Sequence, residues 1–500
     1  MKDNIRSIVI IGGGIGGLSA GIYAQRQGFE STILEKNTAP GGQCTGWDRN
    51  GYHIDGCIHW LTGTKDGGPL NALWREVGAL DGVEIVHPES FLCFEQDGLR
   101  ACIYRDLERL ERSWIELSPE DADVVREFCA DVKLLQGFSF PVDKPTDLMG
   151  PVERLRTMLS MKDAGKILKK YGKMTLQEFA GRFRCPALRE GFGSMAPEWY
   201  NAAMIFFAIA AFTANEASIP AGGSKALSMR MADTYRRLGG RIETSSEART
   251  LEIAGRRVRS VVCSDGRRFP AEYVIAACDA AFVYRTLLDN RYPDPAFEKR
   301  FADPIAYPLA SEALVAVGFA GRTTELAEPM PWSLSFPVEP FTIHGRPIRR
   351  LTVKQFSHEP GFAPHGKTLL ICDINQYQQD YDAWSRLSRE EYRLQKRRLG
   401  DAVTRALEAR FPEMRERLEI LDVATPKTYE RYCNAYRGAF MAFFPTVKGK
   451  MMAHTGRIKG LDNMVLSGQW LQPPGGLPAA LLTGRDAIMR LCRKTGRAFV

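Results

Sequence analysis

Near the start of the chain, glycines spaced for phosphate binding follow a short apolar run. Gly12, Gly14 and Gly17 follow the β-branched segment 7–11 in the order G-x-G-x-x-G. The first glycine allows a tight turn, the second admits a pyrophosphate close to the backbone, and the third lets a helix pack on the strand. The free amides and the dipole of that helix attract an anion. The pattern predicts a buried parallel strand, a phosphate-binding turn and a helix over about residues 16–27.

An acidic residue closes the second predicted strand. Residues 31–35 read STILE, and Glu35 lies eighteen residues after Gly17. At this offset a carboxylate accepts hydrogen bonds from an adenosine ribose and repels a 2′-phosphate. Glycines that serve only a tight turn are the structural alternative, but the strand, the helix and Glu35 together favour a ligand. We therefore predict an unphosphorylated adenine dinucleotide.

The segment 39–60 distinguishes FAD from NAD. It holds the pair Gly41 and Gly42, an Asp-Gly turn at Asp55, and the ending GCIHW, which contains His59. These motifs resemble those of the flavoprotein superfamily that includes phytoene desaturase, carotenoid isomerase, retinol saturase and the flavin amine oxidases. The resemblance implies FAD as the cofactor.

The segment 460–492 resembles the last part of chains in the same superfamily. It reads as a strand over 464–467, a glycine at Gly468, a Pro-Gly loop, and a helix with Pro478 in its first turn. Such a helix start can face the flavin ring and the ribityl chain. Two helix starts, far apart in the sequence, are thus expected to converge on one FAD.

The resemblance also implies a set of FAD-binding residues, and it places the backbone of about 248–250 against the adenine. The residues are Gly12, Gly14, Gly16, Gly17, Glu35, Lys36, Gly41, Gly42, Gln43, His59, Arg249, Gly468, Gly475, Gly476 and Leu477. The chain departs from the family pattern at Gln43, where Arg is common, and at Gln469, where amine oxidases often have Asp or Glu. Both departures weigh against amine oxidase chemistry but not against flavin binding.

Few side chains are candidates for catalysis. Flavin chemistry on a C–C bond requires exclusion of water and sometimes one acid or base. His59 is the first candidate for proton exchange, because it follows the Asp-Gly turn; a histidine that only orients the cofactor is the alternative. Tyr432 is a weaker candidate, in the aromatic segment 425–446 that resembles the family's flavin cover. No spacing typical of a hydrolase triad, a carboxylate pair or a metal site is recognised, so we expect no metal.

A chain of 500 residues is expected to form more than one packed unit. The resemblance implies an α/β fold, with a Rossmann-like FAD-binding domain of the glutathione reductase/amine oxidase type and an inserted α+β substrate-binding domain. The segment 198–224 is expected to line an apolar cavity or to form a plain core helix. The expected boundaries are 1–84, 216–284 and 421–500 for the FAD-binding domain, and 85–215 and 285–420 for the substrate domain.

Composition limits the partners and the compartment. The excess of 67 basic over 59 acidic residues is mild, and no nucleic-acid motif occurs, so we expect no nucleic-acid partner. Eleven cysteines without C-x-x-C spacing argue against a disulfide framework and favour a reducing compartment. The longest apolar run, 202–214, is shorter than the roughly 20 residues that cross a bilayer, and the polar start MKDNIR predicts no signal peptide. We expect a cytoplasmic protein, with peripheral association on the inner face of the membrane left open.

The main hypothesis is an FAD-dependent oxidoreductase acting on CH–CH groups. It would desaturate, saturate or isomerise double bonds in an elongated apolar lipid such as a carotenoid or retinoid, with an electron partner that the sequence does not identify. The resemblance leaves two alternatives: a flavin amine oxidase, and a non-enzymatic prenyl-lipid carrier of the GDP-dissociation-inhibitor type, which shares the fold. The intact glycine motif and Glu35 favour an enzyme over a carrier.

Overall fold

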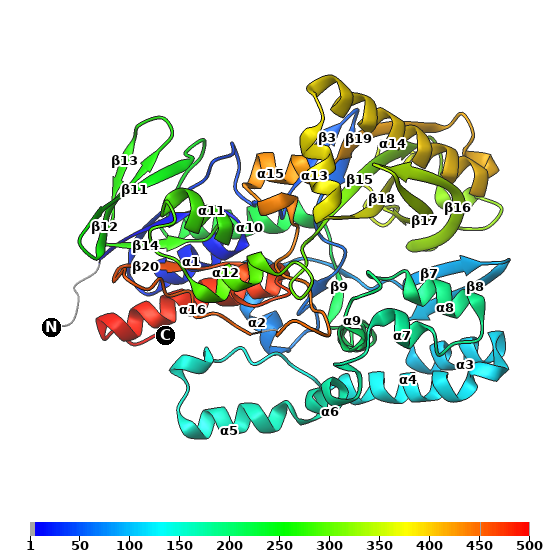
Figure 1. Cartoon of the computed structure of the whole chain (residues 1–500), viewed down its shortest axis with the longest axis horizontal. Helices are drawn as coiled ribbons and strands as arrows, with labels where there is room; N and C mark the ends of the chain where they lie inside the picture. The colour runs from blue at the N-terminus through cyan, green and yellow to red at the C-terminus, as the bar shows by residue number, and fades with distance from the viewer. Residues whose placement is uncertain (1–5, 451, 500) are drawn as a thin grey trace.

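The computed structural model describes residues 6–450 and 452–499, and a five-stranded parallel sheet lies in its first unit (Figure 1). In strand β1, Ile8 and Ile10 pack in the core on one face of the sheet, and Val9 and Ile11 pack in the core on the other. Burial of both faces explains the continuous apolar run predicted as a parallel strand. In sheet order the strands are β10 (Arg241–Glu243), β2 (Glu30–Leu34), β1 (Ser7–Ile11), β14 (Tyr273–Ala276) and β20 (Met464–Leu466).

Helices pack on one face of this sheet and a small antiparallel sheet packs on the other. The core on the helical face joins α1 (Ile15–Arg26), α10 (Gly223–Arg237) and α16 (Gly476–Thr495). The core on the other face includes side chains of β11 (Ala248–Ala254) and β12 (Arg257–Cys263). These two strands and β13 (Arg268–Pro270) form the small sheet, with β12 in the middle. The arrangement confirms the predicted α/β FAD-binding fold.

A seven-stranded sheet forms the second unit, at the upper right of Figure 1. Strand β16 pairs in parallel with β7. This pairing joins the strands formed by residues 90–104 to the strands formed by residues 310–424. Both predicted insertions therefore contribute to one sheet, while the domain boundaries themselves stay predictions. In sheet order the strands are β19 (Leu418–Ala424), β15 (Ala310–Phe319), β18 (Thr368–Tyr377), β17 (Arg346–Gln355), β16 (Ser333–Ile343), β7 (Ser90–Gln96) and β8 (Leu99–Tyr104); α13 (Gln378–Arg386) and α14 (Arg389–Arg410) follow β18.

A group of helices extends below this sheet in Figure 1. Their aromatic side chains, including Trp114, Phe128 and Phe206, form one buried cluster with β7 and β8. Across residues 6–450 and 452–499, no helix combines the length and the apolar character that a membrane span requires. The helices are α3 (Leu107–Leu117), α4 (Ala122–Leu135), α5 (Pro151–Ser160), α6 (Lys162–Tyr171), α7 (Leu176–Ala180), α8 (Pro186–Gly193) and α9 (Ala202–Thr213).

Short elements connect these parts and carry several cavity residues. The hairpin of β3 and β4 ends at Asp55, whose buried carboxylate accepts a hydrogen bond from the Ser224 backbone at 2.9 Å and so ties the hairpin to the start of α10. The other elements are β3 (Gly46–Arg49), β4 (Tyr52–Asp55), β5 (Leu61–Thr62), β6 (Ile85–Val86), β9 (Ala217–Pro220), α2 (Pro69–Glu76), α11 (Ala280–Phe282), α12 (Pro295–Ala302) and α15 (Pro426–Cys433).

The structure contains one disulfide that the sequence analysis did not predict. Cys93 on β7 lies opposite Cys102 on β8, and the two sulfurs are bonded, while the other nine cysteines are free thiols. The spacing of the cysteines does not reveal this bond, because it depends on which residues face each other in the hairpin. A single bond of this kind is not a disulfide framework.

Candidate active site

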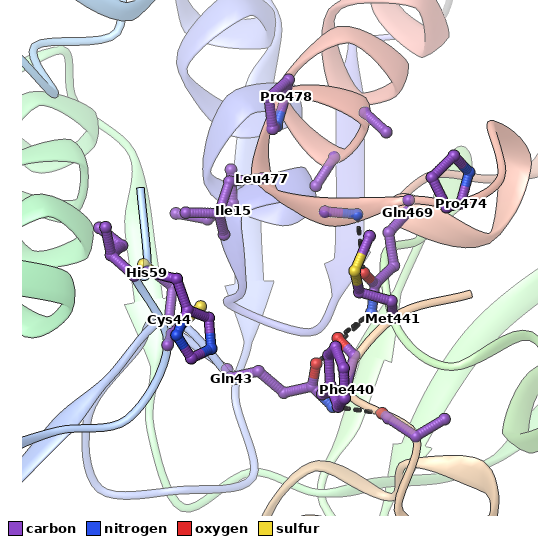
Figure 2. Close-up of a pocket in the computed structure, with 18 of the residues that line it drawn as sticks. Ile15, Gln43, Cys44, His59, Phe440, Met441, Gln469, Pro474, Leu477 and Pro478 are labelled. Carbon is purple, nitrogen blue, oxygen red and sulfur yellow. Dashed lines mark hydrogen bonds between the residues drawn. The ribbon is translucent and has the colours of Figure 1, made fainter. Parts of the chain in front are cut away.

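A cavity of about 950 Å³ lies where the two units meet. Its wall is formed by the glycine turn after β1, the segment 429–444, and the start of α16. Figure 2 shows Ile15 of α1 and Leu477 and Pro478 of α16 at the same pocket. Segments from both ends of the chain therefore form one site.

The glycine turn leaves space for a ligand at one position and none at another. A Cβ atom on Gly17 would lie 1.9 Å from the carbonyl oxygen of Gly12, so only glycine lets α1 approach β1 this closely. A Cβ atom on Gly14 would find its nearest protein atom, the oxygen of Gly41, 3.8 Å away. Gly14 lines the cavity and precedes α1, whose first amides are free to bind an anion. The turn fits a pyrophosphate.

The glycine turn after β20 lies against the start of α1. A Cβ atom on Gly16 would lie 3.1 Å from the Cα of Gly468, and a Cβ atom on Gly468 would meet no protein atom within 4 Å. Gly468 has a φ of +111°, which L-residues rarely adopt, and it lines the cavity. The first residues of α16, Gly476 and Leu477, line the cavity as well. The start of a second helix thus faces the same ligand space, although its Gly476 amide already donates to the Gln469 side-chain oxygen at 3.0 Å.

Glu35 is buried beside the glycine turn. One carboxylate oxygen accepts a hydrogen bond from the Gly13 amide at 2.8 Å, and the other accepts from the Asn37 amide at 2.8 Å and the Asn37 side chain at 2.9 Å. Burial raises the pKa of the Glu35 carboxyl above its usual value, and these hydrogen bonds oppose the rise. Its oxygens keep acceptor capacity for a ribose hydroxyl.

Glu35→Ala is expected to weaken FAD retention by about 1–3 kcal/mol, because the ribose and the Gly13 amide both lose a buried partner. The dissociation constant of FAD, measured by fluorescence titration of the apoprotein, tests this. Glu30→Ala is the matched control, since Glu30 begins the same strand and is exposed. Equal FAD affinity in both variants would contradict a role for Glu35.

The two residues that depart from the family pattern contact each other. The Gln43 amide donates to the Ala439 carbonyl at 2.8 Å, and the Gln469 amide approaches the Gln43 oxygen at 3.4 Å and the Phe440 carbonyl at 3.3 Å. Figure 2 shows this bridge as dashed lines. Gln43 and Gln469 therefore hold the segment around Ala439 and Phe440 in place over the cavity. Both side chains are neutral, whereas the family pattern often has a charged residue at each of these positions.

Most of the predicted FAD-binding residues lie together, and Gly17 supports the turn from behind. Arg249 is exposed on β11 and is not among the cavity-lining residues, whereas its neighbour Ala248 is. Ser246 and Glu247 line the cavity as well, and the expected backbone contact of about 248–250 with the adenine stays a prediction. The predicted residues that line the cavity are Gly12, Gly14, Gly16, Glu35, Lys36, Gly41, Gly42, Gln43, His59, Gly468, Gly475, Gly476 and Leu477.

The two predicted catalytic residues have different surroundings. Tyr432 lines the cavity but is 50% exposed, which suits a position at the rim. The His59 side chain is 35% exposed, and its Nδ1 lies 3.6 Å from Asp373 Oδ2 while its Nε2 lies 3.9 Å from Glu312 Oε2. Sequence reasoning missed both carboxylates; the one available signal was a glutamate inside the apolar strand ASEALVAVGF.

Helix α9 both lines the cavity and packs in the core. Met204, Phe207, Ala208 and Ala211 line the cavity and recur at helical spacing, so they share one face. Residues on the other face, such as Phe206, are buried in the helical core. The cavity-lining and core interpretations therefore apply to opposite faces of one helix.

Known proteins resemble this chain along its length. A phytoene desaturase (lycopene-forming) of Pseudescherichia vulneris is 27% identical over 309 residues, and this match spans 60% of each protein. Prolycopene isomerase 2 of an Oncidium hybrid cultivar is 21% identical over 98% of this chain and 84% of its own length. An oxidoreductase from Methanosarcina mazei has the same fold, with a TM-score of 0.61 and 17% identity over 97% of this chain and all of that one.

The family profile described as flavin containing amine oxidoreductase matches residues 15–491. That range includes Glu35 and the start of α16, and it begins directly after Gly14 of the glycine turn. The open space at Gly14 and Gly468, together with the two helix starts, fits a flavin dinucleotide. The chain belongs to the flavin containing amine oxidoreductase family, and its cofactor is FAD.

Proposed function

We propose that this protein desaturates, saturates or isomerises C–C double bonds in an elongated apolar lipid such as a carotenoid or retinoid. One observation carries the proposal: the cavity that holds the FAD-binding residues continues along the apolar face of α9. The relatives named phytoene desaturase and prolycopene isomerase support the same class of substrate. An amine oxidase or a lipid carrier would share the fold but not this chemistry.

The residues of the chain divide the work in this reaction. Bound FAD supplies the two-electron chemistry. The apolar face of α9 and the aromatic side chains of Phe440 and Phe444 exclude water and align the substrate. His59 is proposed to take or give the proton at a substrate carbon, because it lies at the cavity wall between the Asp373 carboxylate and the Glu312 carboxyl.

Anaerobic spectroscopy of the yellow protein tests this function. The oxidised and the photoreduced forms are each mixed with a panel of carotenoids, retinoids and amines, and the flavin absorbance is followed. Bleaching by a saturated lipid identifies a desaturase, and recovery of the yellow colour by an unsaturated lipid identifies a reductase. Bleaching by amines alone would favour the amine oxidase alternative, and a colourless protein that cannot be reconstituted with FAD would favour the carrier.

Ala208→Trp and Ala211→Trp are expected to lower activity on long substrates by about tenfold or more and to leave the flavin spectrum intact, because both side chains face the cavity. Ala203→Trp is the contrasting variant: Ala203 is fully buried in the helical core, so overpacking should cost stability directly, by about 1–3 kcal/mol. Steady-state kinetics and thermal melting separate the two effects. Equal loss of stability in all three variants would contradict a cavity role for α9.

We further propose that α5 binds the surface of an anionic membrane. Val152, Leu155, Met158 and Leu159 are 55–72% exposed and share one face of the helix. Residues 151–173 carry seven basic and two acidic side chains, which complements anionic lipid. In Figure 1, α5 lies at the lower edge of the molecule.

The cavity is proposed to open near this helix. Phe140 precedes α5 and Leu168 lies on α6; both line the cavity and both are more than 40% exposed. An apolar substrate dissolved in a membrane could therefore enter without crossing water, which suits a poorly soluble lipid.

The double variant Leu155→Asp with Leu159→Asp is expected to reduce sedimentation with phosphatidylglycerol vesicles by about tenfold or more, since two large apolar side chains no longer enter the lipid. Ile305→Asp, at a position 70% exposed outside α5, is the control and should bind as the unmodified protein does. High salt or vesicles of neutral lipid should weaken binding as well. Undiminished sedimentation of the double variant would exclude α5 as the docking site.

A further inference from the structure

Polar side chains interrupt the apolar wall of the cavity at one place. Glu312 on β15, Lys354 on β17 and Asp373 on β18 line the cavity together with His59. In the register of the sheet, Asp373 lies opposite Leu314, so Glu312 and Asp373 are diagonal neighbours on the same face. Burial of two carboxyl groups in an apolar cavity is costly unless they have partners.

Glu312 has a free oxygen on the cavity side. Its side chain is 8% exposed, and Tyr429 donates a hydrogen bond to Oε1 at 2.5 Å. Oε2 lies 3.9 Å from His59 Nε2, which is too far for a hydrogen bond. Burial, together with the nearby charge of Asp373, raises the pKa of Glu312 to about 8. The carboxyl is therefore mostly protonated at pH 7, and it can donate a hydrogen bond.

Asp373 has a buried oxygen that lacks a partner. Lys354 Nζ binds Oδ2 at 2.7 Å, and His59 Nδ1 lies 3.6 Å from the same atom. Oδ1 is buried and has no hydrogen-bond partner. Since buried polar atoms are nearly always paired in native proteins, an unpaired oxygen in a ligand cavity indicates a donor on the ligand.

The charges of these groups decide which donor fits. The Lys354 cation compensates the Asp373 carboxylate, and protonated Glu312 adds no charge near pH 7. A cluster without net negative charge has little to offer an ammonium ion, whose desolvation requires an anionic partner. A neutral hydroxyl, which both donates and accepts, matches the free oxygen of Asp373 and the proton of Glu312.

We infer that Glu312 and Asp373 form a polar subsite that binds a hydroxyl group on an otherwise apolar, elongated substrate. This inference rests on the proposed function, because it places the hydroxyl within the same cavity. A plain hydrocarbon would leave the Asp373 oxygen buried and unpaired, so the subsite selects alcohols over hydrocarbons of the same shape.

Binding of three matched isoprenoid probes to the oxidised holoprotein tests the subsite without turnover. Farnesol, its methyl ether and farnesylamine share one apolar chain and differ only at the polar end. Isothermal titration calorimetry at pH 7 is expected to show that farnesol binds about tenfold more tightly than the ether, because the ether cannot donate to Asp373. Equal affinities of the two, or tighter binding of the amine than of the alcohol at pH 7, would overturn the subsite.

Variants of Asp373 and Glu312 test whether these two residues cause the preference for farnesol over its ether. Asp373→Asn is expected to remove the difference between farnesol and its ether, whereas Glu339→Gln, an exposed position on β16, should keep it. Glu312→Gln is neutral at every pH, so it should bind farnesylamine equally at pH 7 and pH 9. The unmodified protein should bind the amine more tightly at pH 9, since Glu312 is then ionised. A pH-independent affinity of the unmodified protein for the amine would contradict the role of Glu312.

The outcomes distinguish the subsite from the proposed function. If farnesol and its ether bind equally, and Ala211→Trp weakens both, the apolar cavity stands and only the polar subsite fails. If none of the probes binds, the proposed lipid substrate fails together with the subsite.

Discussion

Gly14→Val is expected to weaken FAD binding by about 10- to 100-fold and to leave the apoprotein folded. Gly14 has a φ of −73° and a ψ of −178°, an extended conformation that valine adopts readily, and the nearest protein atom to its added Cβ lies 3.8 Å away. The new side chain therefore occupies space that the pyrophosphate needs. Overpacking of this kind costs about 1–3 kcal/mol, and here the cost lowers the free energy of FAD binding rather than the stability of the apoprotein.

Gly17→Ala is the matched contrast, although the added group is smaller. Its Cβ would lie 1.9 Å from the Gly12 carbonyl oxygen, so β1 and α1 must separate. Thermal melting of the apoprotein should show a lower midpoint for Gly17→Ala and an unchanged one for Gly14→Val, while FAD titration should show the loss in Gly14→Val. Normal FAD affinity in a folded Gly14→Val protein would contradict the assignment of the pyrophosphate site.

His59→Asn is expected to bind FAD normally and to slow flavin reduction or reoxidation by the substrate by about 100-fold or more, as is typical when a general acid or base is lost. The variant should also lose one limb of the pH–rate profile, because asparagine cannot titrate. His59 is positioned for this role by the carboxyl groups of Glu312 and Asp373 on either side of its ring. Stopped-flow absorbance at the flavin band measures the rates.

A second histidine variant serves as the control for this experiment. His365→Asn replaces an exposed histidine outside the cavity lining and should leave both FAD binding and the pH profile unchanged. A histidine that only orients the cofactor would give weaker FAD binding with a modest kinetic change in His59→Asn. Near-normal turnover with normal FAD binding would show that His59 is not catalytic and that positioning alone drives the reaction.

The parts of the site that the sequence predicted are formed by residues close together in the chain. The turn at Gly12 and Gly17, the strand before it and the helix after it follow from backbone geometry over about 25 residues, and Glu35 follows from the length of one strand–helix–strand unit. The family resemblance added the convergence of α16 on the same site. The sequence could not tell that Arg249 is exposed and lies outside the cavity lining, because a shift of one residue along β11 exchanges an exposed residue for the cavity-lining Ala248.

By itself, the sequence determined the dinucleotide turn and the apolar character of α9, because each is encoded by the types and spacing of residues close together in the chain. The family resemblance implied the FAD-binding fold. Only the tertiary structure decided that Glu312 and Asp373 flank His59, that Gln43 meets Gln469, and that Cys93 is bonded to Cys102. The register between paired strands and the packing of distant segments create these contacts. No local pattern specifies them, since strand pairing joins residues whatever their separation along the chain.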